Sequence, residues 1–339
     1  MRVGLRANVS GVVATVFGST GHLGYLTCDR LGSMGSQLVV PYRDDGLSVR
    51  INKVSGDPGQ VVPMPYDFKD ETSVLRTMEK SNLVVNLIGA SKSTMHYSLH
   101  DANVKTAYRI AKFAKQAGVE RFIHVSAFGA DPNAQSEFLR TKYESEEAVK
   151  YFFPKATIVR PTIMYGQNDP YLNRFAMTVR NKLLPIIWSS DAKVQLVAAR
   201  DVAVALQQLV AHPELDGKIW ELLGPEVTTR GELAEKCMRI IGLQRHLIHV
   251  SSEESMFFAK TAKALCLPNK LLPYDLEQAE LDQANMVLQQ ASQTNGLEAL
   301  GIKPANFEMG LVLTMKTWMT KDAPARQGWF QKPTEWRPY

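Results

Sequence analysis

The sequence predicts an α/β protein: a doubly wound parallel Rossmann sheet, then a smaller, mixed C-terminal subdomain and an extended C-terminal arm. Short β-branched apolar segments alternate with amphipathic helical stretches through the first half of the chain. These segments are apolar throughout, which is typical of parallel strands covered by helices on both faces. A glycine-rich turn, GSTGHLG, connects the first of them to a helical stretch.

Six parallel strands are expected in the first half of the chain. They are residues 12–17, 37–42, 61–66, 83–89, 121–126 and 156–161. An amphipathic helix follows the first strand. A second helix is expected at residues 99–117, ended by Gly118, and a third carries Lys142.

The second half is less regular. A short strand at residues 194–196, a helix at 201–210 and a strand at 218–223 are expected. Thr229 followed by Glu232 resembles a capping box, so a helix should begin there.

These elements predict three regions. Residues 10–165 are expected to form a Rossmann domain, residues 166–321 a C-terminal α/β subdomain interleaved with it, and residues 322–339 an extended tail. The segment 251–275 looks amphipathic. Its apolar side chains could rest against a partner or the membrane surface, or belong to an ordinary core; they are Met256, Phe257, Ala264, Leu265 and Leu267.

Composition excludes several classes of protein. The net charge of +5 is spread along the 339 residues without a Lys/Arg block, which argues against nucleic-acid binding. Cys28, Cys237 and Cys266 have no C-x-x-C spacing, so neither a zinc site nor a disulfide framework is expected, and a reducing compartment fits. No apolar run reaches the roughly 18 residues of a membrane span. Arg2 and Arg6 faintly suggest a transit peptide, but a strand near Val12 leaves too little chain for a full one.

The glycine turn has the spacing of a dinucleotide-binding loop. Gly18 would permit the tight turn, Gly21 the approach of the pyrophosphate, and Gly24 close helix–strand packing. Helix N-terminal N–H groups would then face the phosphates. The residues expected to line this part of the site are Gly18, Ser19, Thr20, Gly21, His22, Leu23 and Gly24. The alternative is a tight turn that binds nothing.

The end of the second strand selects the dinucleotide. An NAD site usually has Asp or Glu there, whereas this strand ends in VVPYRDDG, with Arg43 25 residues after Gly18. A guanidinium suits the 2′-phosphate of NADPH, so NADPH is favoured over NADH. Asp44 and Asp45 are expected to turn away. The alternative is that Arg43 is a solvated loop charge.

Three further strand ends should face the cofactor. Asp67 is predicted either to accept from the adenine amino group or to cap the helix that starts near Asp70. Phe68 could lie along the adenine ring. The residues expected to pass under or line the cofactor at the fourth and sixth strands are Leu87, Ile88, Gly89 and Pro161.

The segment SEFLRTKYESEEAV resembles a catalytic helix without its proton donor. Active reductases of the Tyr-x-x-x-Lys type hold both side chains on one helical face, but here Phe138 precedes Lys142 at that spacing. Phenylalanine has no hydroxyl and cannot act as an acid or a base. Tyr143 lies five residues beyond Phe138, about 140° around the helix, and cannot replace it. Ser126, twelve residues before Phe138, is expected to line the site.

Lys142 keeps a use without a tyrosine, because its ammonium can bond the nicotinamide ribose hydroxyls. The alternative is a surface lysine among Glu144, Glu146 and Glu147.

Together these motifs resemble the atypical short-chain dehydrogenase/reductase family, and within it the Rossmann-type accessory subunits of mitochondrial respiratory complex I (NADH:ubiquinone oxidoreductase). The resemblance covers about residues 10–225. It rests on SGVVATVFGSTGHLG, MGSQLVVPYR, GDPGQVVPM, VVNLIG, GVERFIHVSA, FLRTKYESEEAV, RPTIMYGQNDPYLNRFA and VAARDVAVAL, in the family's order. The chain departs from the family at His22, where a bulky apolar residue is usual, and at Phe138, where many relatives keep tyrosine.

The resemblance implies a tightly held, structural NADPH and no catalysis by the chain itself. The implied cofactor contacts are Gly18, Thr20, Gly21, Leu23, Gly24, Arg43 and Lys142. It also implies a peripheral place on the matrix side of the mitochondrial inner membrane, near the ubiquinone-binding junction of the matrix and membrane arms, with other complex I subunits as partners. Two alternatives stay open: a soluble NADPH-dependent reductase that uses Tyr165 or His96 as its acid, and a sensor of the NADP redox state.

Overall fold

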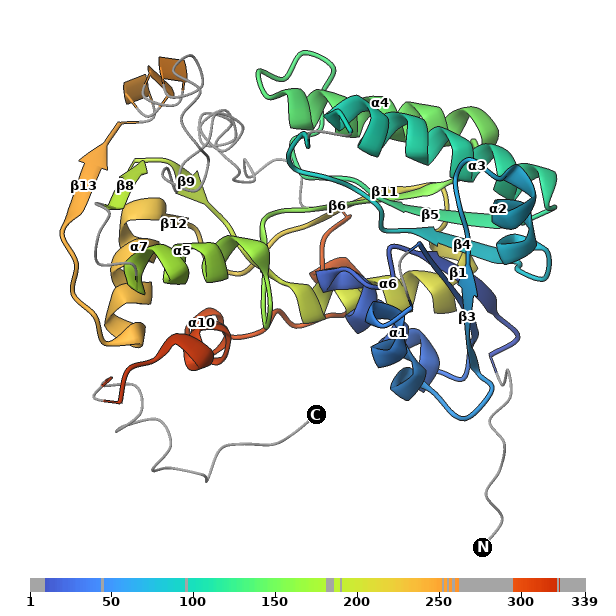
Figure 1. The fold of residues 1–339 in the computed structure, drawn as a ribbon, viewed down its shortest axis with the longest axis horizontal. Helices are drawn as coiled ribbons and strands as arrows, with labels where there is room; N and C mark the ends of the chain where they lie inside the picture. The colour runs from blue at the N-terminus through green and yellow to red at the C-terminus, as the bar shows by residue number, and fades with distance from the viewer. Residues whose placement is uncertain are drawn as a thin grey trace, which may run out of the picture. The chain divides into compact units, whose positions relative to one another are not determined.

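A computed structural model describes most of the chain (Figure 1). The described residues are 10–43, 46–94, 97–180, 186–189, 191–251, 253–254, 256–257, 260–261, 295–321 and 323. The expected tail at 322–339 lies outside them except for residue 323, and so does most of the segment 251–275. In that segment, Phe257 is described and is 66% exposed. None of the helices in the described ranges has both the length and the apolar character needed to cross a bilayer.

The chain forms two compact units, and each is made of three separated segments. Unit 1 consists of Met1–Thr162, Ala199–Leu223 and Ser292–Lys303. Unit 2 consists of Ile163–Ala198, Gly224–Ala291 and Pro304–Tyr339. The second segment of unit 1 lies beyond residue 165, where the sequence placed the boundary of the nucleotide-binding domain.

Unit 1 is built on a seven-stranded parallel sheet with the order β11-β6-β5-β4-β1-β2-β3. The strands are β1 (Val13–Phe17), β2 (Gln37–Tyr42), β3 (Val61–Pro65), β4 (Leu83–Asn86), β5 (Arg121–Val125), β6 (Thr157–Pro161) and β11 (Ile219–Leu222). The strand order reverses between β1 and β4, which makes this the topological switch point where ligands bind in such sheets. The doubly wound parallel sheet is therefore confirmed.

Helices cover both faces of this sheet (Figure 1). They are α1 (His22–Ser33), α2 (Glu71–Met78), α3 (Thr106–Gln116), α4 (Glu137–Phe152) and α6 (Ala199–Ala211), with shorter turns η1 (Ser48–Ser55), η2 (Asp101–Lys105), η3 (Pro213–Leu215) and η5 (Glu298–Leu300). Helices α2, α3 and α4 lie on one face, and α1 and α6 pack together on the other. Each layer buries one helical face on the sheet, as the amphipathic patterns predicted.

The fourth strand and the helix after it differ most from the expectation, whereas the other strand ends of unit 1 agree to within one residue. The fourth strand was expected to reach Gly89, but β4 ends at Asn86, whose side-chain Oδ1 accepts from the Ile88 N–H at 3.1 Å and turns the chain out of the sheet. The helix expected at 99–117 is not uniform, because the wider turn η2 precedes α3. The backbone at Gly118 has φ +76°, a left-handed conformation that suits glycine at a helix end.

Unit 2 combines helices with two-stranded sheets. Within the described residues it includes the helices α5 (Pro170–Arg180), α7 (Arg230–Ile241) and α10 (Phe307–Met315) and the short turn η6 (Lys316–Trp318). Its strands there include β7 (Met164–Tyr165), β8 (Ile186–Ser189), β9 (Lys193–Val194), β10 (Val197–Ala198), β12 (Thr228–Thr229) and β13 (Leu247–Val250). The strand expected at 194–196 is wrong, because the chain leaves β9 after Val194 and re-enters a sheet only at β10. The pairs are β7 with β10, β9 with β12, and β8 with β13.

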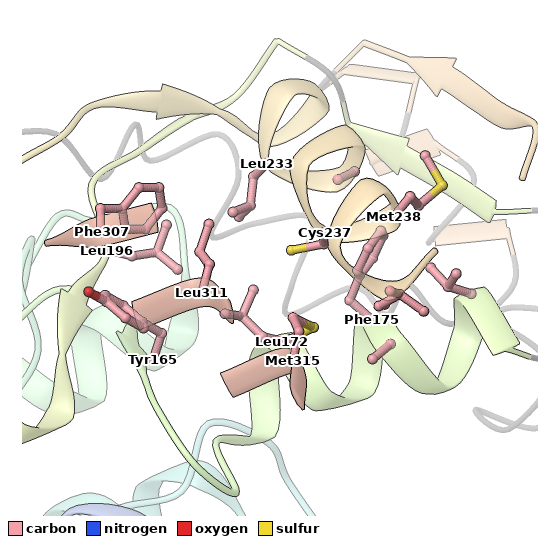
Figure 2. Close-up of a cluster of buried hydrophobic side chains, with 14 of the residues drawn as sticks. Tyr165, Leu172, Phe175, Leu196, Leu233, Cys237, Met238, Phe307, Leu311 and Met315 are labelled. Carbon is pink, nitrogen blue, oxygen red and sulfur yellow. The ribbon is translucent and has the colours of Figure 1, made fainter. Parts of the chain in front are cut away.

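One apolar cluster contains side chains from α5, α7 and α10 of unit 2 (Figure 2). Leu172 and Phe175 from α5, Cys237 from α7 and Met315 from α10 are among its buried members. The predicted capping box is confirmed, since Thr229 accepts from the Glu232 N–H while the Glu232 carboxylate accepts from the Thr229 N–H. Both cysteines in the described ranges, Cys28 and Cys237, are buried free thiols.

Candidate dinucleotide-binding site

The glycine turn between β1 and α1 leaves no room for side chains at two of its glycines. Gly18 has φ +82°, and a Cβ there would lie 3.1 Å from the Leu87 carbonyl carbon and the Ile88 nitrogen. A Cβ at Gly24 would lie 2.1 Å from the Gly18 oxygen, so the third glycine is needed for the first turn of α1 to close on the loop before it. The Gly21 N–H donates to the Gly18 oxygen at 3.0 Å.

Polar atoms without partners surround this turn. Ser19 is fully buried, and its Oγ has no hydrogen-bond partner in the described part of the chain. The same holds for the buried Nε2 of His22, at the first position of α1, and burial lowers the pKa of that ring. Asn52, in η1, donates to the Ser19 carbonyl at 3.1 Å and fixes the loop from behind. Thr20 is exposed and Leu23 is buried.

The strand ends of β2 and β3 bring Arg43 and Phe68 together. Tyr42 pairs with Pro65 at the end of this parallel ladder, so the residues that follow leave the sheet side by side. The exposed Arg43 guanidinium lies 5.9 Å from the centre of the Phe68 ring. Both predicted uses of Arg43, the phosphate contact and the solvated charge, stay compatible with this exposure. Asp44 and Asp45 lie outside the described residues.

The alternative role of Asp67 as a helix cap is wrong. Asp70 is the N-cap of α2, and its carboxylate accepts from the Thr72 N–H at 3.0 Å. Asp67 is exposed; its carboxylate Oδ1 accepts from the Lys69 N–H at 2.9 Å, and its backbone carbonyl accepts from the Ser73 hydroxyl at 3.1 Å. Its second carboxylate oxygen is therefore accessible at the end of β3, as the adenine prediction requires.

Lys142 is not a surface lysine. Its side chain is buried, and Nζ donates to the Val125 carbonyl at 3.3 Å. Two of the three neighbouring acids form ion pairs with other residues: Glu146 Oε2 lies 2.7 Å from Arg160 Nη2, and Glu147 Oε1 lies 3.0 Å from Lys150 Nζ. The third, Glu144, is exposed. Burial lowers the pKa of Lys142 to about 8, against an opposing effect of the Glu146 charge.

The loop after β4 converges on that ammonium. A Cβ at Gly89 would lie 2.5 Å from Lys142 Nζ, so only glycine permits this approach. Leu87 and Ile88 are partly exposed at the carboxyl end of the sheet. The Phe138 ring centre lies 5.9 Å from the same Nζ, which confirms that residues 138 and 142 share one helical face.

Two more hydroxyls at neighbouring strand ends lack partners. Ser126 follows β5, and Thr162 follows Pro161 at the end of β6. Both side chains are buried, and neither hydroxyl has a hydrogen-bond partner in the described ranges. Pro161 accepts from the Phe128 N–H at 2.9 Å and is buried. Buried hydroxyls are normally satisfied by protein or ligand, so these atoms point to a bound polar molecule.

Sequence reasoning missed the asparagines that hold these loops. Asn103 in η2 accepts from the Ala90 N–H at 2.8 Å and donates to the Ala90 carbonyl and the Thr141 hydroxyl. It thereby joins the loop after β4 to α4. The only signal in the sequence is a polar residue at a buried position of an amphipathic helix, and that signal does not name the partner.

These residues fit a dinucleotide. The glycine turn presents backbone N–H groups at a helix N-terminus, which is a site for phosphate. Orphaned buried atoms of Ser19, His22 and Ser126 supply donors or acceptors along the same edge of the sheet, and Lys142 supplies a buried cation at its other end.

Comparison with known proteins agrees with this fold. A model of the family described as "NAD dependent epimerase/dehydratase family" matches residues 14–222, and the chain belongs to that family. Within it, the chain groups with a set of mitochondrial proteins. It is 45% identical to the Arabidopsis thaliana "NADH dehydrogenase (ubiquinone) 1 alpha subcomplex subunit 9, mitochondrial", over 68% of this chain and 58% of that protein.

A second relative matches over more of both lengths. The chain is 34% identical to the Neurospora crassa "NADH-ubiquinone oxidoreductase 40 kDa subunit, mitochondrial", over 90% of this chain and 79% of that protein. Among solved structures, an Escherichia coli NADPH-dependent quinone oxidoreductase complexed with NADPH superposes with a TM-score of 0.67 over 88% of this chain and 98% of that one. Its identity is 18%, so this likeness concerns the fold alone.

Proposed function

We propose that this chain is an accessory subunit of mitochondrial complex I that binds NADPH and performs no redox chemistry itself. It would lie peripherally on the matrix side of the inner membrane, near the ubiquinone-binding junction of the matrix and membrane arms, in contact with other subunits. The names of the Arabidopsis and Neurospora relatives support the complex, and the motif resemblance supports the place within it.

The observation that carries the proposal is the pairing of Phe138 with Lys142. A bound NADPH would supply a hydride, and reduction of a carbonyl also needs a proton from the protein. The group beside Lys142 Nζ is a phenyl ring, which carries no transferable proton. Loss of a general acid costs about 10²- to 10⁴-fold in rate. The site would therefore bind the cofactor but lack the proton donor that catalytic turnover needs.

The alternative acids gain no support. Tyr165 is buried in the core of unit 2, where its ring packs edge-to-face on Phe307 with ring centres 5.5 Å apart. His96 lies outside the described residues. Tyr143 is partly buried on a different side of α4 from Phe138 and Lys142, as its place in the helix dictates.

Arg43 supports NADPH over NADH. An NADH site usually carries an acidic residue at the end of the second strand to accept from the ribose 2′-OH. Here that place holds the exposed guanidinium of Arg43, 5.9 Å from the centre of the Phe68 ring. A guanidinium attracts a phosphate and cannot accept a hydrogen bond from a hydroxyl.

A bound NADPH would act on this chain as a structural ligand. Residues from β1, β2, β3, β4, β5, β6 and α4 would contact one molecule, so its binding would tie these elements together. A ligand that binds only the folded state stabilises it by about 2.7 kcal/mol at a free concentration 100 times its Kd.

One experiment on native membranes tests both parts of the proposal. The membranes are solubilised in mild detergent, the chain is followed on a native gel, and the nucleotide released from the purified assembly is identified. Co-migration with a large NADH-oxidising assembly that contains tightly bound NADPH is the expected result. A free monomer that turns over NADPH would favour the reductase instead, and rapid exchange of the nucleotide would favour the redox sensor.

A further inference from the structure

A buried chain of side chains crosses the middle of the sheet in unit 1. Asn86 at the end of β4, His124 on β5 and Ser145 on α4 are all essentially inaccessible to solvent. Asn86 Nδ2 lies 3.2 Å from His124 Nδ1, and His124 Nε2 lies 3.0 Å from Ser145 Oγ. The Ser145 hydroxyl lies 2.7 Å from the Lys142 carbonyl oxygen. This series of hydrogen bonds therefore ends at the backbone carbonyl of Lys142, whose ammonium lies at the candidate site.

The groups bonded at the two ends of this series, the Ile88 N–H and the Lys142 carbonyl, fix which atoms carry the hydrogens. The Ile88 N–H donates to Asn86 Oδ1, so the amide must present its NH₂ group to His124. Nδ1 is therefore an acceptor. The Ser145 proton is committed to the Lys142 carbonyl, so Ser145 Oγ accepts from the ring, and Nε2 carries the hydrogen.

This arrangement satisfies every member with a neutral ring. An imidazolium would direct an Nδ1–H at the Asn86 NH₂ group and leave two donors facing each other. Burial, with a smaller contribution from the Lys142 charge on α4, lowers the pKa of His124 to about 3 and keeps the ring neutral.

We propose that His124 is a positioning residue of the cofactor site: as the neutral Nε2–H tautomer, it holds the loop after β4 and the Lys142 turn of α4 at one fixed separation. The loop and the lysine meet at the point where a Cβ on Gly89 would lie 2.5 Å from Lys142 Nζ, so a small shift of either would change that contact. The identity of the ligand rests on the function proposed above; the tautomer and the coupling do not.

Nitrogen NMR of the full chain tests the tautomer directly. The ring nitrogens of His124 are assigned by their loss in His124→Phe. We expect a protonated Nε2, an unprotonated Nδ1 and no titration between about pH 5 and 9. An Nδ1–H tautomer, or a ring that titrates in that interval, overturns the proposal.

Coupling across β5 is tested with Ser145→Ala, which removes the acceptor of Nε2 from the α4 side. The Ile88 amide, on the far side of the ring, is expected to shift and to exchange faster with solvent. In the His124→Phe background the same substitution should leave that amide unchanged. An Ile88 amide that responds equally in both backgrounds, or in neither, overturns the coupling.

The consequence for the site is measured with NADPH itself. Ser145→Ala and Asn86→Ala should each raise the dissociation rate of NADPH by at most about tenfold, because a lost buried hydrogen bond shifts an equilibrium by about that factor and these bonds act on NADPH only through the loop and Lys142. The matched control is Thr314→Val, which removes a buried hydroxyl of α10 in unit 2 that donates to the Gly310 carbonyl at 2.9 Å. If the network variants lose stability but release NADPH at the wild-type rate, the role is merely structural and the proposal is wrong. A wild-type chain that binds no NADPH defeats the proposed function, while the two NMR tests still decide this inference.

Discussion

The two ends of the candidate site are built in different ways. At the β1, β2 and β3 strand ends the site consists of backbone at the glycine turn, the buried Ser19 beside it, and exposed side chains such as Arg43 and Asp67. At the β4, β5 and β6 strand ends it consists of buried side chains, with Lys142, His124 and Glu146 bonded to other residues. Substitutions of the exposed side chains at the first end should mainly change ligand binding, whereas those in the glycine backbone and at the buried second end should also change the stability of the fold.

The largest effect is expected at the second end, for Arg160→Met. Arg160 makes two bonds, of 2.7 and 2.9 Å, to Glu146, which is fully buried beside Lys142. Removing one member of a buried pair leaves a buried charge and costs about 4 kcal/mol. The free energy of unfolding in urea measures this loss. The control is Lys150→Met, which breaks the exposed pair with Glu147 and should cost at most about 1 kcal/mol. Equal losses would contradict the comparison.

The backbone of the glycine turn should be nearly as sensitive. In Gly24→Ala the new Cβ would overlap the Gly18 carbonyl oxygen, since the two would be 2.1 Å apart, and neither backbone segment can move far. We expect a loss of about 3 kcal/mol, the upper range for overpacking. Gly21→Ala is the matched change, with its nearest contact at 3.3 Å, and should lose no more than about 1 kcal/mol. Thermal unfolding measures both losses, and Gly24→Ala should have the lower melting temperature. Equal melting temperatures would show that the turn can relax.

Arg43→Ala should affect binding and leave stability unchanged, because Arg43 is exposed and follows the end of β2. Loss of charge-assisted bonds to a 2′-phosphate is worth about 2 to 3 kcal/mol, so the Kd for NADPH should rise roughly 100-fold. Affinity for NADH, which lacks that phosphate, should not change. An unaltered Kd for NADPH would mean that Arg43 is only a solvated charge.

Lys142→Met separates stability from binding at the second end. Burial lowers the pKa of Lys142 from 10.5 to about 8, so between these values the unfolded chain binds more protons than the folded chain. Wild-type stability therefore rises with pH through that window. The variant lacks the buried charge and should be more stable at pH 7 by about 2 kcal/mol, with the difference fading toward pH 10.5. Urea unfolding from pH 7 to 10 tests this, with the exposed Lys80→Met as control. A difference independent of pH would contradict the burial of the charge.

Phe138→Tyr should have the smallest effect. The ring is partly exposed and an added hydroxyl can reach solvent, so stability should change by less than about 0.5 kcal/mol. We expect no NADPH oxidation with quinone or aldehyde substrates above the rate of the unchanged chain, because a proton donor does not by itself create a substrate site. Measurable turnover would place the wild-type chain one hydroxyl away from a reductase.

Local patterns predicted much of the fold and the local geometry of the glycine turn and of α4. All six expected strands of the first half exist, because runs of apolar β-branched residues bounded by turns specify strands without help from distant partners. The glycine turn and the shared helical face of Phe138 and Lys142 could also be predicted, because each depends only on spacing within a few residues. The end of β4 was missed because a single hydrogen bond from Ile88 to Asn86 turns the chain there.

The sequence by itself determined which residues could form the glycine turn and that the residue four positions before Lys142 has no hydroxyl. Only the tertiary structure decided that Lys142 is buried, that β11 joins the first sheet, and that Asn86, His124 and Ser145 form one chain. These last contacts join residues 38 and 21 positions apart. Periodicity says which side of a strand is buried, but the identity of a hydrogen-bond partner depends on which strands and helices become neighbours after folding.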